Sequence, residues 1–381
     1  MSDIENIIIV GAGPGGLYLS ALLHQAGVGH TLLEAGDTNM IRGFDVILHH
    51  QFFTIAKELG ITKSELHTIE ARHEFIMKRT GKNIMRIDMY DEPMNSVRRS
   101  NIIDVLLSRT DEKYIKRNVK IIDVIEHKDY VELKDMGGKI YKARYVIGSD
   151  GMNSIVRNRL FKRGTVHSVY SALYFFVNGG PHCSITSCVS GGVHNVLFPN
   201  SDGKSVLYVA TKNKCDPNIS PLENLKNIST DNEEVKYLLK HIDTNANSLL
   251  TLIRRTNLFK FARGRVALIG DAAHGETPLL GLGTTMAIAD ASTINNLLVQ
   301  AFKNKTLSYY QAEKISNKYY YDRVNKVKQL HRLTTMFEYI FGFLPPRLDS
   351  IREKFFIIFA PILKMLFRYL RMRIRRSMER Q

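Results

Sequence analysis

The sequence holds a glycine triplet whose spacing could bind a pyrophosphate. Gly11, Gly13 and Gly16 match the pattern G-x-G-x-x-G and follow the apolar run at residues 7–10. In that pattern the first glycine permits a tight turn, the second lets the backbone approach the phosphates, and the third lets a helix lie close to a strand. A helix that begins near Pro14 would direct free N–H groups and a partial positive charge toward the phosphates. This stretch therefore predicts dinucleotide binding.

A carboxylate follows at the distance where the ribose of such a dinucleotide would lie. An apolar helix face over residues 17–26 leads into a second apolar stretch, 30–33. Glu34 ends that stretch, 18 residues after Gly16, where it would accept hydrogen bonds from an adenosine ribose. The alternative is a glycine-rich turn in an unrelated α/β protein, and the complete unit of strand, turn, helix, strand and acid argues against it.

Two later stretches repeat the arrangement of a buried strand, a glycine turn and a helix. They are residues 145–148 with Asp150 and Gly151, and residues 265–269 with Gly270 and Asp271. On an open parallel sheet, ligands bind in the crevice outside the carboxyl ends of the strands. We therefore expect both turns to lie where a ligand binds.

A glycine-rich loop follows the second of these acids. It holds Pro278, Gly281 and Gly283, and a helix is expected from about Thr284 to Phe302. Glycines before a helix N-terminus let backbone N–H groups approach a ligand and present positive potential to it. The loop is therefore a further candidate ligand contact.

Three single residues carry chemistry that the sequence leaves open. Arg98 and Arg99 stand at the start of an expected helix, where the helix dipole disfavours cations. A nearby anion such as phosphate and a solvated pair explain them equally well. His274 is interpreted as a structural or capping histidine, because its neighbours in the sequence supply no relay partner.

The composition fits a globular protein with ample core, because 44% of the 381 residues are hydrophobic and 24% are charged. The three cysteines form no C-x-x-C pair, so neither a disulfide framework nor a zinc site is indicated, and we expect no bound metal. The start of the chain shows no signal-peptide pattern, which favours a reducing, cytoplasmic setting. The net charge of +16 is accompanied by no recognised nucleic-acid motif, so we expect no nucleic-acid partner.

The order of the expected elements predicts an α/β protein with a Rossmann-like parallel sheet and an inserted, mostly antiparallel sheet. The dinucleotide domain is expected at residues 1–165, with short strands at 67–92 that join the inserted sheet. The substrate domain is expected at 166–261, with one helix around 231–241, and the dinucleotide domain resumes at 262–335.

The tail at residues 336–381 is apolar with arginines at intervals and is expected to be helical. Its apolar run, 355–363, is interrupted by Pro361 and is too short to span a membrane. Docking on the protein's own surface or on a second subunit is one interpretation, and contact with a membrane surface as a basic amphipathic helix is another. A monomer and a homodimer both fit.

Three separated motifs occur together, in an order and spacing that cover residues 4 to about 330. They are Gly11-x-Gly13-x-x-Gly16 with Glu34, Ser149-Asp150-Gly151-x-Asn153-Ser154-x-x-Arg157, and Gly264-Arg265-Val266-Ala267-Leu268-Ile269-Gly270-Asp271-Ala272-Ala273-His274 with Pro278 and Gly281-x-Gly283. The set resembles the class A FAD monooxygenases, the flavoprotein aromatic hydroxylases of the p-hydroxybenzoate hydroxylase type. The members of that family bind NAD(P)H transiently, which is consistent with a single dinucleotide fingerprint in this chain.

The resemblance implies a set of FAD contacts. The adenosine diphosphate half would be held by the first motif and Glu34, and Arg99 would contact the flavin side of the cofactor. Many members carry arginine where this chain has Ala35, and Arg42 could supply that charge instead. The implied contacts are Gly11, Gly13, Pro14, Gly15, Gly16, Glu34, Ala35, Arg42, Arg99, Asp150, Gly151, Gly270, Asp271, Pro278, Gly281, Gly283 and Thr284.

The later motifs would serve the flavin and the nicotinamide cofactor. The resemblance implies that Asp150 and Gly151 contact both FAD and NAD(P)H, and that Asp271 binds the ribityl chain. Backbone N–H groups of the loop at residues 278–283 would stabilise negative charge on the reduced flavin. The chemistry belongs to the flavin, and the sequence names no side-chain general base.

The function that the resemblance implies is hydroxylation of an aromatic or polyketide-like molecule with NAD(P)H and O2, through a flavin C4a-hydroperoxide. The tail resembles the C-terminal helices that close over substrate in the tetracycline-inactivating members, which makes tetracyclines candidate substrates. Two other functions stay open because a fold does not determine a function. One is a membrane-associated FAD reductase or dehydrogenase of a lipid or quinone, and the other is a non-catalytic protein that binds flavin and a ligand.

Overall fold

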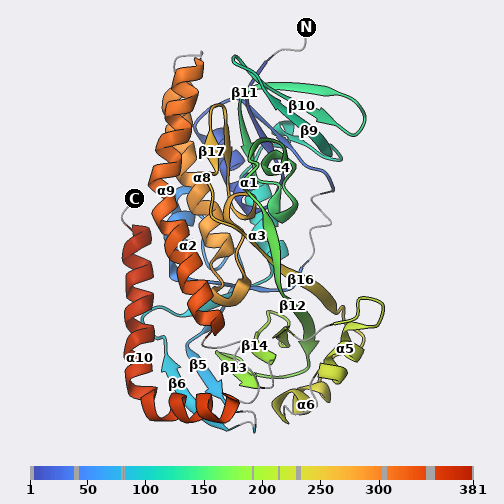
Figure 1. Cartoon of the computed structure of the whole chain (residues 1–381), viewed down its shortest axis with the longest axis vertical. Coiled ribbons are helices and arrows are strands. Elements are labelled where there is room, and N and C mark those ends of the chain that lie inside the picture. Colours follow the sequence, from blue (N-terminus) through green and yellow to red (C-terminus); the bar gives the residue numbers. More distant parts are fainter. Residues whose placement is uncertain are drawn as a thin grey trace.

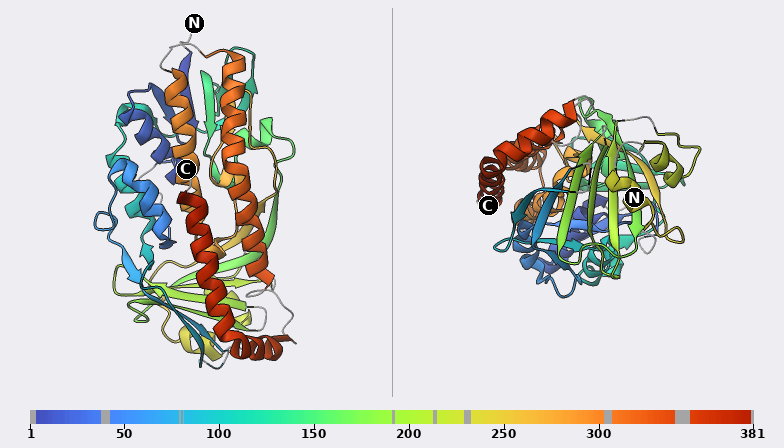
Figure 2. Two further views of the ribbon diagram at one scale, coloured as in Figure 1. Left: turned by 90° about the vertical axis from the view of Figure 1, so that its left-hand side faces the viewer. Right: turned by 90° about the horizontal axis from the view of Figure 1, so that it is seen from below.

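The computed structural model describes residues 4–37, 43–78, 80, 82–190, 193–212, 215–228, 233–302, 307–339 and 348–379. The molecule is elongated, with a mixed sheet toward one end and a largely antiparallel sheet toward the other (Figure 1). Two long helices, α8 (Gly283–Phe302) and α9 (Tyr309–Phe337), run lengthwise beside the first sheet, as both side views show (Figures 1 and 2).

The first sheet has eight strands, and its centre is parallel. The order β17-β18-β11-β1-β2-β8 contains parallel pairs from β18 to β8, while β10 and β9 extend the sheet as an antiparallel hairpin. The strands are β1 (Glu5–Val10), β2 (His30–Leu33), β8 (Ile115–Lys116), β9 (Ile121–Glu126), β10 (Val131–Asp135), β11 (Ile140–Gly148), β17 (Ala262–Arg263) and β18 (Val266–Leu268). The predicted α/β class with a Rossmann-like parallel sheet is confirmed.

The second sheet has seven strands in the order β16-β12-β15-β14-β13-β5-β6. All its pairs are antiparallel except β13 with β5, so residues 73–88 are joined to strands about a hundred residues later. The strands are β5 (His73–Met77), β6 (Asn83–Asp88), β12 (Val166–Val177), β13 (Ser184–Ser190), β14 (Val193–Pro199), β15 (Ser205–Thr211) and β16 (Leu249–Thr256). The domain boundaries at residues 165, 261 and 335 stay predictions.

A small antiparallel sheet, β3-β7-β4, lies in the segment that precedes β8 in the chain. Its strands are β3 (Val46–Leu48), β4 (Ile69–Ala71) and β7 (Met94–Val97). Phe44 and Ile47 from the start of this segment pack against the second sheet. The small sheet therefore places residues 44–49 close to the substrate side of the molecule.

The helices cover the first sheet and one flank of the second. Those not yet given are α1 (Pro14–Gln25), α2 (His50–Ala56), α3 (Arg99–Ser108), α4 (Ile155–Leu160), α5 (Pro221–Ile228), α6 (Glu233–Leu239), α7 (Asp271–His274) and α10 (Asp349–Glu379). The expectation of one helix in the inserted segment was wrong, because the segment holds two helices, α5 and α6. Apolar residues of both helices pack under the second sheet. None of the helices in the described ranges is long and apolar enough to cross a membrane.

The glycine motif folds as its sequence predicts. Residues 7–9 form the centre of β1 and are completely buried, which explains their uninterrupted apolar character. Pro14 is the first residue of α1, where its missing N–H has no intrahelical partner. Because α1 packs closely on α8, the two helix N-termini meet near the same edge of the sheet.

Candidate functional site

One cavity of about 710 Å³ lies between the first sheet and the second. Its upper part is lined by the ends of β1, β11 and β18 and by the loop before α8, and its lower part by the second sheet and the small sheet. The size is that of a typical ligand pocket. The cavity therefore joins a nucleotide-type crevice to a second compartment with a different lining.

The three motif glycines have different surroundings. A Cβ on Gly11, whose φ is +101°, would lie 2.5 Å from the carbonyl oxygen of Ser149, and a Cβ on Gly16 would overlap the carbonyl oxygen of Gly11. Gly13 has open space, since the only atom near its Cβ position is that same Ser149 oxygen at 4.0 Å. Gly11 and Gly16 are thus required by packing, while Gly13 leaves room beside the cavity.

Helix α1 presents its N-terminus to this space without a side-chain cap. Gly13, Pro14 and Gly15 line the cavity, and the N–H groups of the first helical turn have no partner within the helix. An uncapped N-terminus beside an open glycine is the arrangement that binds a phosphate. The donor set therefore fits the pyrophosphate of a dinucleotide.

Glu34 holds the glycine turn from the neighbouring strand. Its Oε2 accepts a hydrogen bond of 2.6 Å from the N–H of Ala12, and its Oε1 accepts one of 2.9 Å from the N–H of Gly36. Glu34 is half-buried at the carboxyl end of β2 and Ala35 is exposed, and neither residue belongs to the cavity lining. Arg42 lies outside the described residues.

The second motif forms a turn beside the first. The Oδ2 of Asp150 accepts hydrogen bonds from the N–H groups of Ile155 (2.7 Å) and Val156 (3.3 Å), at the start of α4. Burial raises the pKa of the Asp150 carboxyl. Gly151 lines the cavity and Asp150 lies behind it, so the backbone of this turn, more than its carboxylate, faces the open space.

The third motif is held by a buried ionic cluster. The Oδ2 of Asp290 on α8 accepts hydrogen bonds from the N–H of Gly270 (2.9 Å) and from Nε2 of His274 (2.5 Å), and its Oδ1 accepts one from Nε of Arg323 (2.6 Å). Burial alone would lower the pKa of His274, but the charge and hydrogen bond of Asp290 outweigh it and raise that pKa. The cluster fixes the turn that carries Asp271.

This cluster corrects one premise about His274. The sequence showed no relay partner nearby, yet Asp290 contacts the imidazole from 16 residues away and Arg323 contacts the same carboxylate. All three side chains are buried, and none of them lines the cavity. The structural interpretation of His274 is retained on different grounds.

Asp271 itself lines the cavity, and burial within the protein raises its pKa, against the opposing charges of His274 and Arg99.

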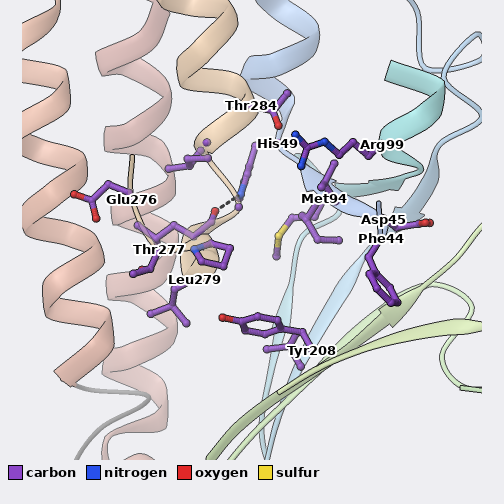
Figure 3. A pocket seen from close by; sticks show the side chains of 18 of the residues that line it. Phe44, Asp45, His49, Met94, Arg99, Tyr208, Glu276, Thr277, Leu279 and Thr284 are labelled. Atoms are coloured by element: carbon purple, nitrogen blue, oxygen red, sulfur yellow. Dashed lines mark hydrogen bonds between the residues drawn. The ribbon is translucent and has the colours of Figure 1, made fainter. Parts of the chain in front are cut away.

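The two adjacent arginines have different positions. Arg98 forms an ion pair with Asp202 in the turn between β14 and β15. Arg99 lines the cavity, and its guanidinium extends toward Thr284 at the start of α8 (Figure 3). Arg98 thus links the small sheet to the second sheet, while Arg99 faces the site, and a bound anion beside Arg99 stays a prediction.

The loop before α8 forms the boundary between the two parts of the cavity. Residues 278–280 form a short 3₁₀ turn, and Gly281 has a φ of +63° that favours glycine. Nε2 of His49 donates a hydrogen bond of 2.8 Å to the carbonyl oxygen of Leu280, which holds the loop against the small sheet (Figure 3). Pro278, Gly281, Gly283 and Thr284 line the cavity, together with Gly270 and Asp271.

The lower part of the cavity has an aromatic wall that sequence reasoning missed. The ring of Phe44 stacks on those of Tyr174 (5.2 Å) and Phe176 (4.8 Å). The hydroxyl of Tyr208 donates a 3.0 Å hydrogen bond to that of Tyr170, and it points toward the loop that holds Leu279 (Figure 3). Burial raises the pKa of Tyr208, so its hydroxyl stays protonated.

A buried network of charges supports the loop from behind. Arg255 on β16 donates to Glu276 through Nε (2.7 Å) and to Glu338, the C-cap residue of α9, through Nη2 (2.7 Å). Thr277 donates to the same Glu338 oxygen (2.7 Å), and His331 contacts the other oxygen of Glu276 at 2.6 Å. The Glu276 carboxylate points away from the open space (Figure 3). This network therefore links the second sheet, the loop and α9.

The charges of the lining are strongly asymmetric. Arg99 is the one arginine or lysine among the described residues that line the cavity, and it lies on the dinucleotide side. Acids line the space on both sides: Asp45, Glu74, Glu92 and Asp271, together with Glu276, whose carboxylate is turned away from it. Within the described residues no cluster of histidine, cysteine and acids could hold a metal ion.

The comparisons with known proteins agree with this site. The family described as FAD binding domain matches residues 5–316, and the chain belongs to that family. An FAD-dependent monooxygenase of Penicillium ochrochloron, ptmM, is 23% identical over 88% of this chain and 89% of its own. The resemblance to the class A FAD monooxygenases is therefore confirmed.

Two solved structures show the same fold. One is Klebsiella pneumoniae HpxO, complexed with FAD and uric acid, with a TM-score of 0.79, 19% identity and coverage of 92% of both chains. The other is the tetracycline destructase Tet(51), with a TM-score of 0.68 and 17% identity, covering 95% of this chain and 98% of its own. These likenesses extend over nearly the whole chain, including both sheets and the helices that follow them.

Proposed function

We propose that this protein hydroxylates an aromatic or polyketide-like small molecule, with FAD as cofactor and NAD(P)H and O2 as co-substrates. The observation that supports the proposal is that an uncapped helix N-terminus and an aromatic wall line the same cavity, on opposite sides of one glycine-containing loop. When bound, FAD supplies the redox chemistry, accepting a hydride from NAD(P)H and activating dioxygen. The setting is the cytoplasm, where NAD(P)H is available.

The proposed FAD contacts follow the geometry of the upper part. Gly13, Pro14 and Gly15 receive the pyrophosphate at the start of α1, and Glu34 orients the glycine turn and receives the ribose. Asp271 and Arg99 lie near the loop, where they bind the ribityl and flavin side. The backbone of the loop at 278–283 donates N–H groups to developing negative charge.

The lining of the lower part favours a neutral substrate. Benzoate-type substrates need a cation for their carboxylate, and the described lining offers none beyond Arg99 beside the dinucleotide. The proton of the Tyr208 hydroxyl is directed at Tyr170, so its oxygen can instead accept a hydrogen bond from the hydroxyl of a phenol. Stacked Phe44 and Tyr174 suit a flat ring. We therefore propose a neutral phenol-like or polycyclic substrate.

Tetracyclines are a second candidate substrate class. The observation that favours them is the likeness to the tetracycline destructase Tet(51), which covers 98% of that chain. Their fused rings and many hydroxyl and carbonyl groups match a wall of aromatic rings with tyrosine hydroxyls. An acidic lining also tolerates their amine.

The test is NADPH and NADH oxidation by the FAD-loaded protein, with neutral phenols, benzoates and a tetracycline, followed by oxygen uptake and product mass. We expect oxidation to be stimulated by neutral phenols or the tetracycline, with a product heavier by one oxygen atom. Stimulation confined to benzoates would contradict the proposed substrate class. Oxidation that is indifferent to oxygen would favour a reductase, and ligand binding without turnover would favour a binding protein.

A further inference from the structure

Helix α10 carries apolar side chains beyond those that pack against the rest of the protein. Phe356 and Leu363 are buried against a cluster from β5, β6 and the residue that follows β6, made up of Ile76, Met85, Ile87 and Met89. Figure 2 shows α10 lying against the outside of the molecule, with no element of the fold on its outer side. In the described part of the helix, one face is thus docked on the protein and side chains on the opposite face are exposed.

The open side carries a continuous apolar stripe. Ile351, Phe355, Ile358, Ile362 and Met365 are spaced alternately four and three residues apart, which places them on one helical face. All five are exposed, Ile358 to 69% and Met365 to 73%. Exposed apolar patches of this kind mark an interaction surface.

The length of the apolar stretch excludes a transmembrane role for this helix. Pro361 lies inside α10, and the helix bends along its length (Figure 1), as a missing backbone N–H and a steric clash produce. The described part of α10 does not meet the length and apolarity of a membrane span. A helix with such a stripe binds in the plane of an interface.

The charges of α10 identify which interface it fits. Residues 349–379 contain eight basic and three acidic residues in a chain of net charge +16. Lys354 and Lys364 flank the stripe and are exposed. Two copies of this face would bring like charges together, which disfavours a homodimer, whereas an anionic lipid surface complements them.

We propose that the exposed stripe of α10 inserts into the interfacial region of an anionic lipid bilayer and holds the protein reversibly on the membrane surface. The packed side of the same helix lies on β5 and β6, whose Ile76 and Ile87 line the cavity. Membrane binding would therefore place the wall of the cavity close to the lipid. The proposal concerns a surface and does not depend on the reaction proposed above.

The test is sedimentation of the full-length protein with vesicles of phosphatidylcholine alone and with added phosphatidylglycerol. We expect binding to the anionic vesicles that weakens as salt is raised, because part of the attraction is electrostatic. The variant I358Q/I362Q should lower the partition coefficient by about tenfold or more, since apolar area drives insertion. Glutamine retains helix propensity and these side chains are exposed, so folding is unaffected.

The matched control is I122Q/I125Q, which removes two exposed isoleucines from β9. It should bind vesicles as the wild type does. A further variant, K354Q/K364Q, should reduce binding to anionic vesicles by about fivefold per lysine and leave binding to neutral vesicles unchanged.

Three outcomes would overturn the proposal. They are no vesicle binding by the wild type, equal binding by I358Q/I362Q, and a wild-type dimer that this variant dissociates, as measured by analytical ultracentrifugation. The last result would assign the stripe to a second copy of the chain. Because the readout is binding, a failure here is separate from a failure of the proposed hydroxylation.

Discussion

Gly13 and Gly16 belong to one motif but differ in what surrounds them. The atoms packed around Gly16 leave no room for a side chain, whereas the space beside Gly13 is open toward the cavity. A methyl group added at Gly16 should therefore lower the stability of the fold, whereas one added at Gly13 should lower the affinity for the cofactor.

We expect Gly16→Ala to destabilise the protein by roughly 3 kcal/mol, because its Cβ overlaps the carbonyl oxygen of Gly11 and the backbone must shift. Gly13→Ala should unfold at the wild-type temperature but bind FAD at least about tenfold more weakly, because the methyl group occupies the space proposed for the pyrophosphate. Thermal unfolding and FAD titration of the apoprotein measure both effects. Wild-type FAD affinity in Gly13→Ala would show that the pyrophosphate does not cross this turn.

Asp45 is a residue that the sequence did not single out and that the fold places in an unfavourable setting for a charge. It is 4% exposed at the edge of the cavity, and burial raises the pKa of its carboxyl to about 6, while the charge of Arg98 opposes the shift. The folded state therefore holds this proton more tightly than the unfolded chain does.

The pH dependence of stability should report this carboxyl. Its contribution is fully present below its ordinary pKa of 3.8 and is lost as the pH rises through about 6. Asp45→Asn lacks this titration. The difference between its free energy of unfolding and that of the wild type should therefore rise by roughly 3 kcal/mol from about pH 4 to about pH 7. Urea unfolding of both proteins across that range measures the difference. Parallel stability curves would show that Asp45 keeps an ordinary pKa in the fold.

At the scale of elements, Arg255 connects three parts of the fold. They are strand β16, the loop that precedes α8, and the end of helix α9. This side chain is 6% exposed and neutralises Glu276 and Glu338, which come from two other elements. Buried ion pairs contribute little net stability when intact, but removal of one partner leaves an uncompensated charge. The network therefore makes the position of the loop depend on contacts that are far apart in the sequence.

Arg255→Met should destabilise the protein by roughly 3–5 kcal/mol, because two buried carboxylates lose their cation. Its neighbour Arg254 offers a matched control, since it donates to Asn153 from a more accessible position. Arg254→Met should change stability by no more than about 1 kcal/mol. Urea denaturation compares the two. Equal effects would mean that the charges around Glu276 do not hold this part of the fold.

At the scale of the whole molecule, the last helix packs on two strands that contribute side chains to the cavity. The FAD contacts proposed above all precede residue 285, whereas α10 covers strands whose side chains line the lower part. We therefore expect cofactor binding and enclosure of the substrate to depend on different segments of the chain.

Deletion of residues 340–381 should leave FAD bound and abolish regiospecific turnover. Loss of Phe356 and Leu363 uncovers the apolar surface of β6 and admits water to the reaction space. FAD absorbance after gel filtration, NADPH consumption and product analysis test this together. Unchanged product distribution in the shortened protein would refute a role for the tail in enclosing the substrate.

The sequence determined the features that depend on neighbouring residues. The strand, glycine turn and helix at residues 7–25 follow from an apolar run, from backbone angles that only glycine adopts readily, and from a proline at the start of a helix. The same local rules indicated the turns at Gly151, Gly270 and Gly281, and these lie at the cavity. Three such motifs in order were enough to indicate the α/β fold and its family.

The tertiary structure alone decided what the rest of the cavity contains. Tyr208 and Phe44 belong to strands and loops whose local patterns are ordinary, and they become a wall only when the second sheet packs on residues 44–47. In the same way, Asp290 reaches His274 and Arg255 reaches Glu338 across separations that no local pattern encodes. Local backbone preferences are set by adjacent residues, whereas a ligand cavity depends on side chains that only long-range packing brings together.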